Sequence, residues 1–283
     1  MSTRQHHSSP IKSYDGDSVL VKQLRILIAS KYSEIFHCVI VHGSVATNEV
    51  INYSDFDGLL IVKDRYANSK QLKVFKKESM KLILKFDPLQ HHGWFQILES
   101  QLLDFPQSYL PHELLEHSKL LFPNVDGFII NPSIDIKKVD YSKSFELLIL
   151  SIETQSKLNF ENMRIYDIKS FLSKIMLLPS MYYSVKHKKG IFKKQSFDLV
   201  NVDFTSEEWK CIEIASEIRL NWKYNLSFFQ KFVMTQPEIV FRRLTKKYIA
   251  PKGNKEILDK LNDDFLNSLK LFIKKIKHNI LNH

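Results

Sequence analysis

The chain contains little of the residues that mark specialised protein classes. It has 2 Cys, 7 Gly and 9 Pro in 283 residues. Two cysteines are too few for a disulfide framework or a structural zinc site, so we expect Cys38 and Cys211 to pack as small hydrophobic side chains. The low glycine and proline contents argue against disorder, as do 44% hydrophobic and 12% aromatic residues. The sequence is that of a chain that folds.

Long apolar runs are also missing. No segment approaches the roughly 18 consecutive apolar residues that a membrane-spanning helix needs. Residues 1–18 are polar and lack the hydrophobic region of an export signal. We therefore expect a cytoplasmic protein with no membrane partner.

Positive charge is concentrated in the second half of the chain. The net charge is +10, yet residues 1–130 contain equal numbers of basic and acidic side chains, so residues 131–283 carry the whole excess. A basic half beside a neutral half fits a polyanionic ligand, such as a nucleoside triphosphate or a nucleic acid. It fits a lysine-rich coding bias equally well.

Strands and helices alternate in the first half. Apolar side chains at helical spacing predict helices, and short β-branched runs predict buried strands. Asp15 to Asp17 are suited to cap the first helix, and Pro88 ends the second. The predicted elements are a helix at 19–30, strands at 35–41 and 56–62, an amphipathic helix at 68–86, a strand at 89–98 and a mostly helical segment from 106 to 127.

The second half predicts helices almost throughout, because long apolar patterns recur from about residue 141 with few turn residues. A basic loop at 186–194 and a break at 251–254 interrupt them. We place the domain boundary near residues 127–140. The predicted fold is α+β, with a small mixed sheet and helices in residues 1–130, followed by an all-helical domain in residues 131–283.

The strongest local signal is a glycine turn followed by two aspartates. Gly43 and Ser44 end the first predicted strand, and Asp55 and Asp57 open the second after ten intervening residues. Backbone amides at a glycine can approach a phosphate closely, and the Ser44 hydroxyl adds a donor. Two carboxylates two apart on a strand share one face, and Mg²⁺ relieves their repulsion while it binds substrate phosphates. The pattern indicates phosphoryl or nucleotidyl transfer.

Each half of this pattern has an ordinary structural interpretation. Asp-x-Asp often forms a solvated strand entrance, and Gly-Ser is common in loops. Their combination between two apolar strands favours function. Over residues 35–100 it resembles the Gly-Ser, spacer, Asp-x-Asp signature of the nucleotidyltransferase superfamily typified by DNA polymerase beta, nearest in layout to the aminoglycoside nucleotidyltransferases.

This resemblance implies a catalytic domain in residues 1–130 and a helical carboxyl-terminal domain. It also implies two Mg²⁺ ions held by Asp55 and Asp57, and a triphosphate contacted by Gly43 and Ser44. It leaves the acceptor open.

Members of this superfamily usually supply a third acidic residue from a later strand, and Asp87 is our candidate for metal binding and catalysis. In a regular strand, side-chain alternation places Asp87 on the face opposite to Gln90 and His92. His92 or Gln90 would then face the site in its place, and a neutral histidine can ligate a metal or act as a base. Whether Asp87, His91 or His92 completes the site stays open at this point. The structural alternative for Asp87 is a turn residue before proline.

Basic residues of the second half offer further contacts. We assign triphosphate binding to Lys193 and Lys194 of the loop around Gly190; the alternative is a solvated basic loop. A second basic group, at Arg242–Arg243 and Lys246–Lys247, would suit RNA if aromatic residues stacked beside it, although the sequence has no RNA-recognition motif.

Together these features predict a Mg²⁺-dependent enzyme that transfers a nucleoside monophosphate from a nucleoside triphosphate such as ATP to a hydroxyl and releases pyrophosphate. A small-molecule or protein acceptor is favoured over nucleic acid, because the basic residues form no motif that follows a nucleic-acid backbone. Two alternatives stay open: a catalytically inactive nucleotide-binding or antitoxin-like module, and an RNA terminal transferase. The sequence specifies neither the triphosphate nor the oligomeric state.

Overall fold

The computed structural model describes residues 3–125 and 127–281, and the chain forms two compact units. The first unit comprises Met1–Val139 together with Phe228–Thr245, and the second comprises Asp140–Ser227 and Lys246–His283. Residues 228–245 therefore return to the unit formed by the first half of the chain. The sequence-based division at residue 130 does not include this return.

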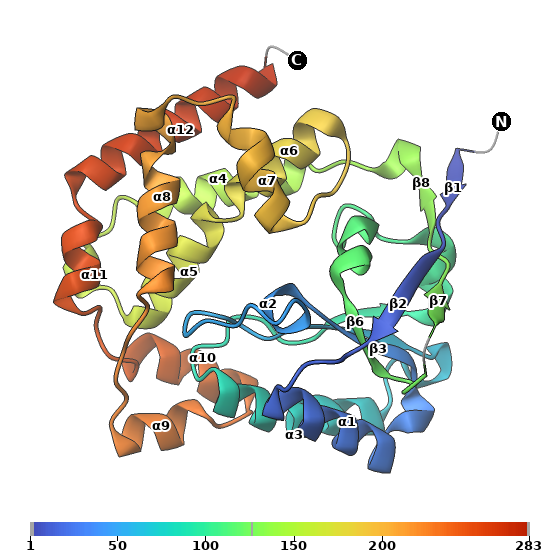
Figure 1. Cartoon of the computed structure of the whole chain (residues 1–283). Coiled ribbons are helices and arrows are strands. Elements are labelled where there is room, and N and C mark those ends of the chain that lie inside the picture. Colours follow the sequence, from blue (N-terminus) through green and yellow to red (C-terminus); the bar gives the residue numbers. More distant parts are fainter. Residues whose placement is uncertain (1–2, 126, 282–283) are drawn as a thin grey trace. The chain divides into compact units, whose positions relative to one another are not determined.

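A six-stranded mixed sheet forms the centre of the first unit (Figure 1). Its order is β5-β4-β3-β6-β2-β7, and β1 and β8 form a separate two-stranded sheet. β3 pairs antiparallel with β4 and β6, whereas β4 runs parallel to β5. The strands are β1 (Arg4–His6), β2 (Ser9–Ser13), β3 (Phe36–His42), β4 (Asp57–Val62), β5 (Phe95–Leu98), β6 (Lys119–Phe122), β7 (Phe128–Ile130) and β8 (Ser133–Asp135).

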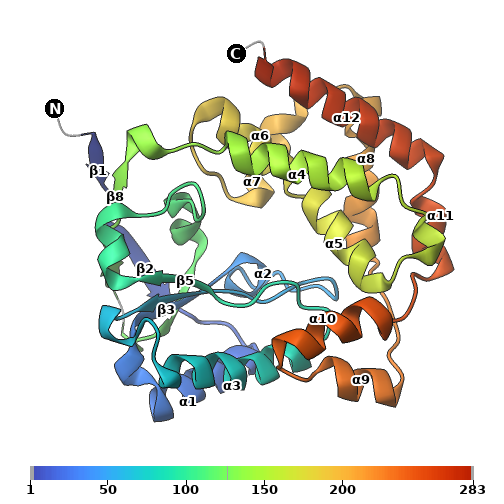
Figure 2. The ribbon, with the colours of Figure 1, turned by 180° about the vertical axis from the view of Figure 1, so that it is seen from behind.

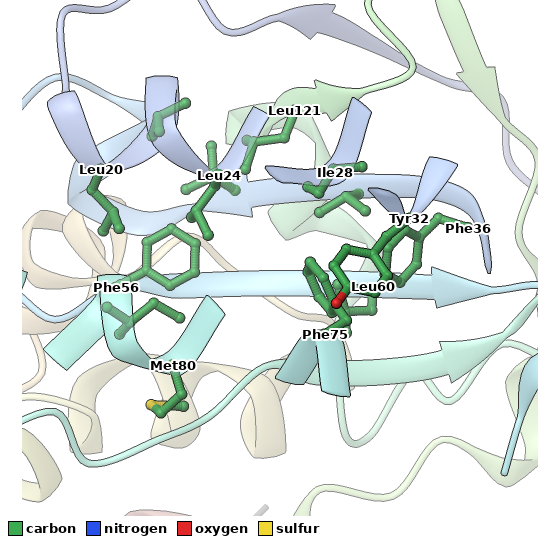
Figure 3. Close-up of a cluster of buried hydrophobic side chains, with 14 of the residues drawn as sticks. Leu20, Leu24, Ile28, Tyr32, Phe36, Phe56, Leu60, Phe75, Met80 and Leu121 are labelled. Carbon is green, nitrogen blue, oxygen red and sulfur yellow. The ribbon is translucent and has the colours of Figure 1, made fainter. Parts of the chain in front are cut away.

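Helices α1 and α3 cover one face of this sheet (Figure 3). Their apolar residues recur at helical spacing and pack on Phe56 and Leu60 of the β4 region. Each fully buried side chain of this kind contributes about 1.5–3 kcal/mol. The helices and 3₁₀ turns of the first unit are α1 (Val19–Lys31), η1 (Ser33–Ile35), α2 (Gly43–Ala46), η2 (Asp64–Tyr66), α3 (Lys70–Phe86), η3 (Glu99–Asp104), η4 (His112–His117), η5 (Ile136–Lys138), α9 (Phe228–Met234) and the part of α10 (Ile239–Tyr248) up to Thr245.

The opposite face of the sheet carries a second core. Cys38 and Ile40 of β3 and Leu59 and Ile61 of β4 pack there against residues of the segment that contains η3 and η4, such as Leu115. Cys38 and Cys211 are both buried, as predicted, and burial raises the pKa of each thiol, that of Cys211 to about 12.

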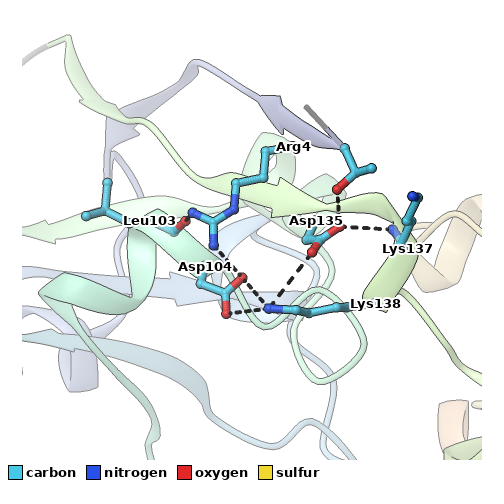
Figure 4. A network of polar contacts seen from close by, with 7 residues as sticks. Arg4, Leu103, Asp104, Asp135, Lys137 and Lys138 are labelled. Carbon is cyan, nitrogen blue, oxygen red and sulfur yellow. Dashed lines mark hydrogen bonds and ion pairs between the residues drawn. The ribbon is translucent and has the colours of Figure 1, made fainter. Parts of the chain in front are cut away.

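An ion-pair network fastens the small β1–β8 sheet to η3 and η5 (Figure 4). Arg4 and Lys138 both contact the Asp104 carboxylate, at 3.6 Å and 3.1 Å, and Lys138 lies 3.9 Å from Asp135. Exposed pairs of this kind each contribute about 0–1 kcal/mol. The network therefore orients the β1–β8 sheet more than it stabilises the fold.

The described part of the second unit contains helices and no strand, apart from an isolated bridge between Arg164 and Lys252 (Figure 2). The helical prediction is confirmed for the described residues from Ser142 onward, but the predicted all-helical domain began at residue 131, and β8 lies inside that range. Asn159 and Thr205 cap η6 and α8, respectively. The elements are α4 (Ser142–Gln155), η6 (Phe160–Asn162), α5 (Ile165–Ile175), α6 (Leu178–His187), α7 (Lys193–Asn201), α8 (Ser206–Leu220), the last residues of α10, α11 (Lys255–Lys260) and α12 (Asp263–Leu281).

None of the helices in the described ranges combines the length and the apolar content needed to cross a membrane.

Two predicted elements differ from the structure. The strand expected at 89–98 begins only at Phe95, because residues 87–90 form a turn. In the segment 106–127, expected to be mostly helical, the described residues form the 3₁₀ element η4 and then β6, which pairs with β3 inside the sheet. Asp15 and Asp17 do not cap α1; they pair with Lys119 and Lys22.

Candidate active site

The turn after β3 places Gly43 directly against the Asp57 carboxylate. His42, the last residue of β3, is the cross-strand partner of Asp57, the first residue of β4. Gly43 has a φ of +67°, a conformation that favours glycine. A Cβ atom at Gly43 would lie 3.0 Å from Oδ2 of Asp57. The glycine turn and the second aspartate of the motif therefore form one compact structure.

Strand alternation sets the face on which Asp57 lies. Asp57 has the parity of Leu59 and Ile61, whose side chains pack on the face opposite to α1 and α3. His42 has the parity of Ile40 and lies on that same face. Asp55 precedes β4, so the alternation that was expected to align the two carboxylates does not apply to it.

Gln90 fixes the backbone between the two aspartates. Its side-chain Oε1 accepts a hydrogen bond from the Phe56 N–H at 2.9 Å, and its Nε2 donates to the Phe56 carbonyl at 2.8 Å. Gln90 is 1% exposed and Phe56 is fully buried. The side-chain amide of Gln90 thus makes the two hydrogen bonds to Phe56 that a neighbouring strand would otherwise make. In the sequence, Gln90 was considered only as a group that faces the site.

His91 lies beside Asp55. Its Nδ1 is 3.6 Å from Oδ2 of Asp55, and the two side chains are 8% and 13% exposed. The first carboxylate of the motif therefore has an imidazole as its neighbour.

His42 was not predicted as a site residue. Its Nε2 is buried and makes no hydrogen bond within the described part of the chain. Burial lowers the pKa of His42; Asp57 acts to raise this pKa and His92 lowers it further. The ring of Phe95 lies 5.7 Å from that of His42 and 6.0 Å from that of His92. An imidazole and an aromatic ring thus adjoin the Asp57 side of the turn.

Asp87 ends α3 and is 4% exposed. Its Oδ1 accepts a hydrogen bond from the Leu89 N–H at 3.0 Å, and its carbonyl accepts one from the Gln90 N–H. These are the contacts of a turn residue. Through them Asp87 shapes the turn that presents Gln90 to Phe56.

The predicted triphosphate ligands Lys193 and Lys194 begin α7 in the second unit, whereas Gly43, Ser44 and the three aspartates belong to the first. The expected basic loop is shorter than predicted, because α6 continues to His187 and Lys188 ends it in a left-handed conformation. Lys186 is held within its own unit by an ion pair of 2.7 Å to Asp203.

The donor set at the glycine turn suits a magnesium ion bound mainly by its substrate. Among residues 3–125 and 127–281, no three His, Cys, Asp or Glu side chains are grouped so that they could hold a metal. Mg²⁺, however, typically uses one or two carboxylates and completes its shell with phosphate oxygens and water. Asp57, with Asp55 two residues earlier, fits that requirement.

Comparison with known proteins identifies no relative. No protein-family model matches the chain, and neither the curated proteins nor the solved structures include a match. The functional interpretation therefore rests on these residues and their geometry.

Proposed function

We propose that the protein is a Mg²⁺-dependent nucleotidyltransferase that moves a nucleoside monophosphate from a nucleoside triphosphate to a hydroxyl acceptor. The observation that supports this most directly is the contact between Gly43 and Asp57. A left-handed glycine at a strand end, set against a carboxylate that opens the antiparallel neighbour, combines an anion-binding turn with a cation ligand. A triphosphate bound with Mg²⁺ needs both.

In this proposal, Asp57 and Asp55 hold the magnesium, and the Gly43 turn with the Ser44 hydroxyl binds the triphosphate. Magnesium supplies charge stabilisation for the attacking and leaving oxygens. The acceptor oxygen forms a bond to the α-phosphorus, the bond to the bridging oxygen of the β-phosphate breaks, and pyrophosphate leaves. The Gln90 clamp keeps the aspartate segment in place.

Asp87 keeps its proposed role as the third acidic group, which completes the metal site or accepts the acceptor proton. Its hydrogen bond to Leu89 uses one carboxylate oxygen, Oδ1. An Asp87→Asn variant separates this role from the turn contact, because the asparagine Oδ1 can still accept the Leu89 bond. Loss of turnover with unchanged thermal stability would support the catalytic role.

The experiment that tests the activity is incubation of the protein with Mg²⁺ and each α-labelled nucleoside triphosphate, with and without cell extract or a hydroxylated small molecule. We expect pyrophosphate release and label transfer that disappear in Asp57→Asn. Asp17→Asn is the matched control, because Asp17 is fully exposed and pairs only with Lys22 at the surface. Equal turnover by the two variants would refute the proposal.

A second candidate is a nucleotide-binding or antitoxin-like module without turnover. The observation that favours it is the turn role of Asp87, together with the lack of a three-ligand metal group in the described ranges. This candidate predicts that the protein binds a triphosphate with Mg²⁺ and never releases pyrophosphate. Turnover that depends on Asp57 would exclude it.

A further inference from the structure

A row of lysines follows the exposed side of α3. Lys70, Lys73, Lys77, Lys81 and Lys85 recur every three or four residues and all are exposed, so they share one side of the helix. The helix contains six lysines and one glutamate. From Lys70 to Lys85 the row extends about 22 Å at 1.5 Å per residue. Positive charges one helical turn apart thus form a linear track.

In the same unit, α9 and α10 present large apolar side chains to solvent. Phe228, Phe229 and Phe232 of α9 are 90%, 62% and 63% exposed, and Phe241 of α10 is 41% exposed. Large apolar side chains that gather at the surface of a folded unit often mark an interaction site. Arg243 lies exposed among these residues.

Two side-chain contacts join these features within the first unit. Lys77 of the lysine row pairs with Glu238, at the start of α10, at 2.8 Å. One turn along each helix, the Arg242 guanidinium donates to the sulfur of Met80 at 3.0 Å. In both overall views α10 lies beside α3 (Figures 1 and 2). We call the five lysines and the four phenylalanines together the α3–α10 surface.

We propose that the α3–α10 surface binds single-stranded nucleic acid, with phosphates along the lysine row and bases on the phenylalanines. Proteins that bind single strands combine a basic track for the backbone with aromatic side chains on which bases stack. Phenylalanine suits this role because every base has a π face. The proposal concerns binding alone and does not depend on nucleotidyl transfer.

The lysine row favours nucleic acid over a lipid surface. A helix that lies in a membrane interface inserts the apolar side of the same helix that carries its lysines. The apolar side of α3 is buried in the core and is not available for insertion. α9 and α10 carry exposed basic residues of their own, Lys231 and Arg243, next to the exposed phenylalanines. A basic track and exposed aromatic side chains on one unit match the phosphates and the bases of a single strand.

The test is the binding of a fluorescein-labelled, mixed-sequence 20-nucleotide single strand, as RNA and as DNA, by anisotropy between 50 and 300 mM salt without Mg²⁺ or triphosphate. For four or five phosphate contacts we expect log K to fall with log salt at a slope of about −3. Lys73→Gln with Lys81→Gln should reduce the magnitude of that slope by about 1.4. Phe228→Ser with Phe232→Ser should weaken binding about tenfold or more at constant slope.

The matched control is Lys22→Gln with Lys137→Gln, which removes two exposed lysines of the same unit outside the α3–α10 surface. This control should leave the slope of log K against log salt unchanged. It should change the affinity by no more than about twofold, which is the general effect of net charge. Absence of binding at 50 mM salt, or equal effects of the two lysine pairs, would overturn the proposal. Binding to phosphatidylserine vesicles without binding to the oligonucleotide would also overturn it. A protein that binds neither the RNA nor the DNA oligonucleotide, but self-associates unless the phenylalanines are replaced, would overturn it as well.

Discussion

Replacement of Gln90 by leucine removes both hydrogen bonds that hold Phe56 between the two aspartates. Leucine approximates the volume of glutamine but can neither accept from the Phe56 N–H nor donate to its carbonyl. Because Phe56 is fully buried and Gln90 is 1% exposed, water cannot substitute for the lost partners. A buried backbone group without a partner costs about 1–3 kcal/mol, so two such groups predict a destabilisation of about 2–6 kcal/mol.

The assay should report on this segment alone, because a chain of two units need not unfold in one transition. Hydrogen exchange of the Phe56 amide meets this need. If the free energy of opening this segment falls by about 2 kcal/mol or more, the Phe56 amide exchanges about 30-fold faster or more. Gln71→Leu on the exposed side of α3 is the control and should leave this amide unchanged. Unchanged Phe56 protection in Gln90→Leu would show that the clamp does not hold the segment.

Gly43→Ala should destabilise the first unit by about 1–3 kcal/mol, because a non-glycine residue is strained at positive φ and its Cβ would press on Asp57; thermal unfolding with Ser44→Ala as the control measures this. In the second unit, Asp203→Asn should cost about 2 kcal/mol at pH 7, because Asp203 accepts hydrogen bonds from Lys186 and Tyr182. Burial raises the pKa of Asp203, but these bonds outweigh it and leave the pKa below its ordinary value of 3.8. The stability is therefore present above that value and lost as the pH falls through the lower folded pKa. Urea unfolding of both proteins at pH 7 and at several pH values below 3.8 should show a stability difference that shrinks as the pH falls, and a difference independent of pH would refute the ionic origin.

Local sequence patterns predicted an element correctly where that element buries apolar residues at regular spacing on one face. The strands β3 and β4 and the helices α1 and α3 are confirmed close to their predicted bounds, because their apolar residues define period and length. Among the short strands, β5 was predicted as the end of a longer strand, and the others were missed. β6 has only four residues and owes its conformation to pairing with β3 about eighty residues earlier in the chain. No local signal distinguishes such a segment from a buried turn.

The candidate site, too, was predicted only where local patterns define it. Gly43 and Asp57 were predicted from the motif, and antiparallel pairing of two recognisable strands brings them together. The roles of Gln90 and His42 depend on contacts across the sheet that the spacing of residues does not encode. A signal for His42 did exist, since a polar residue directly before the glycine interrupts an otherwise apolar strand end.

The path of the chain has a consequence for its biosynthesis. Residues 140–227 form an insertion between two stretches that build the first unit. During translation, the sheet can form long before α9 and α10 leave the ribosome, and Lys77 and Met80 of α3 stay without their α10 partners until then. A gene fragment that stops at residue 139 would leave this side of α3 permanently uncovered, so soluble expression of the first unit calls for grafting residues 228–245 back onto it.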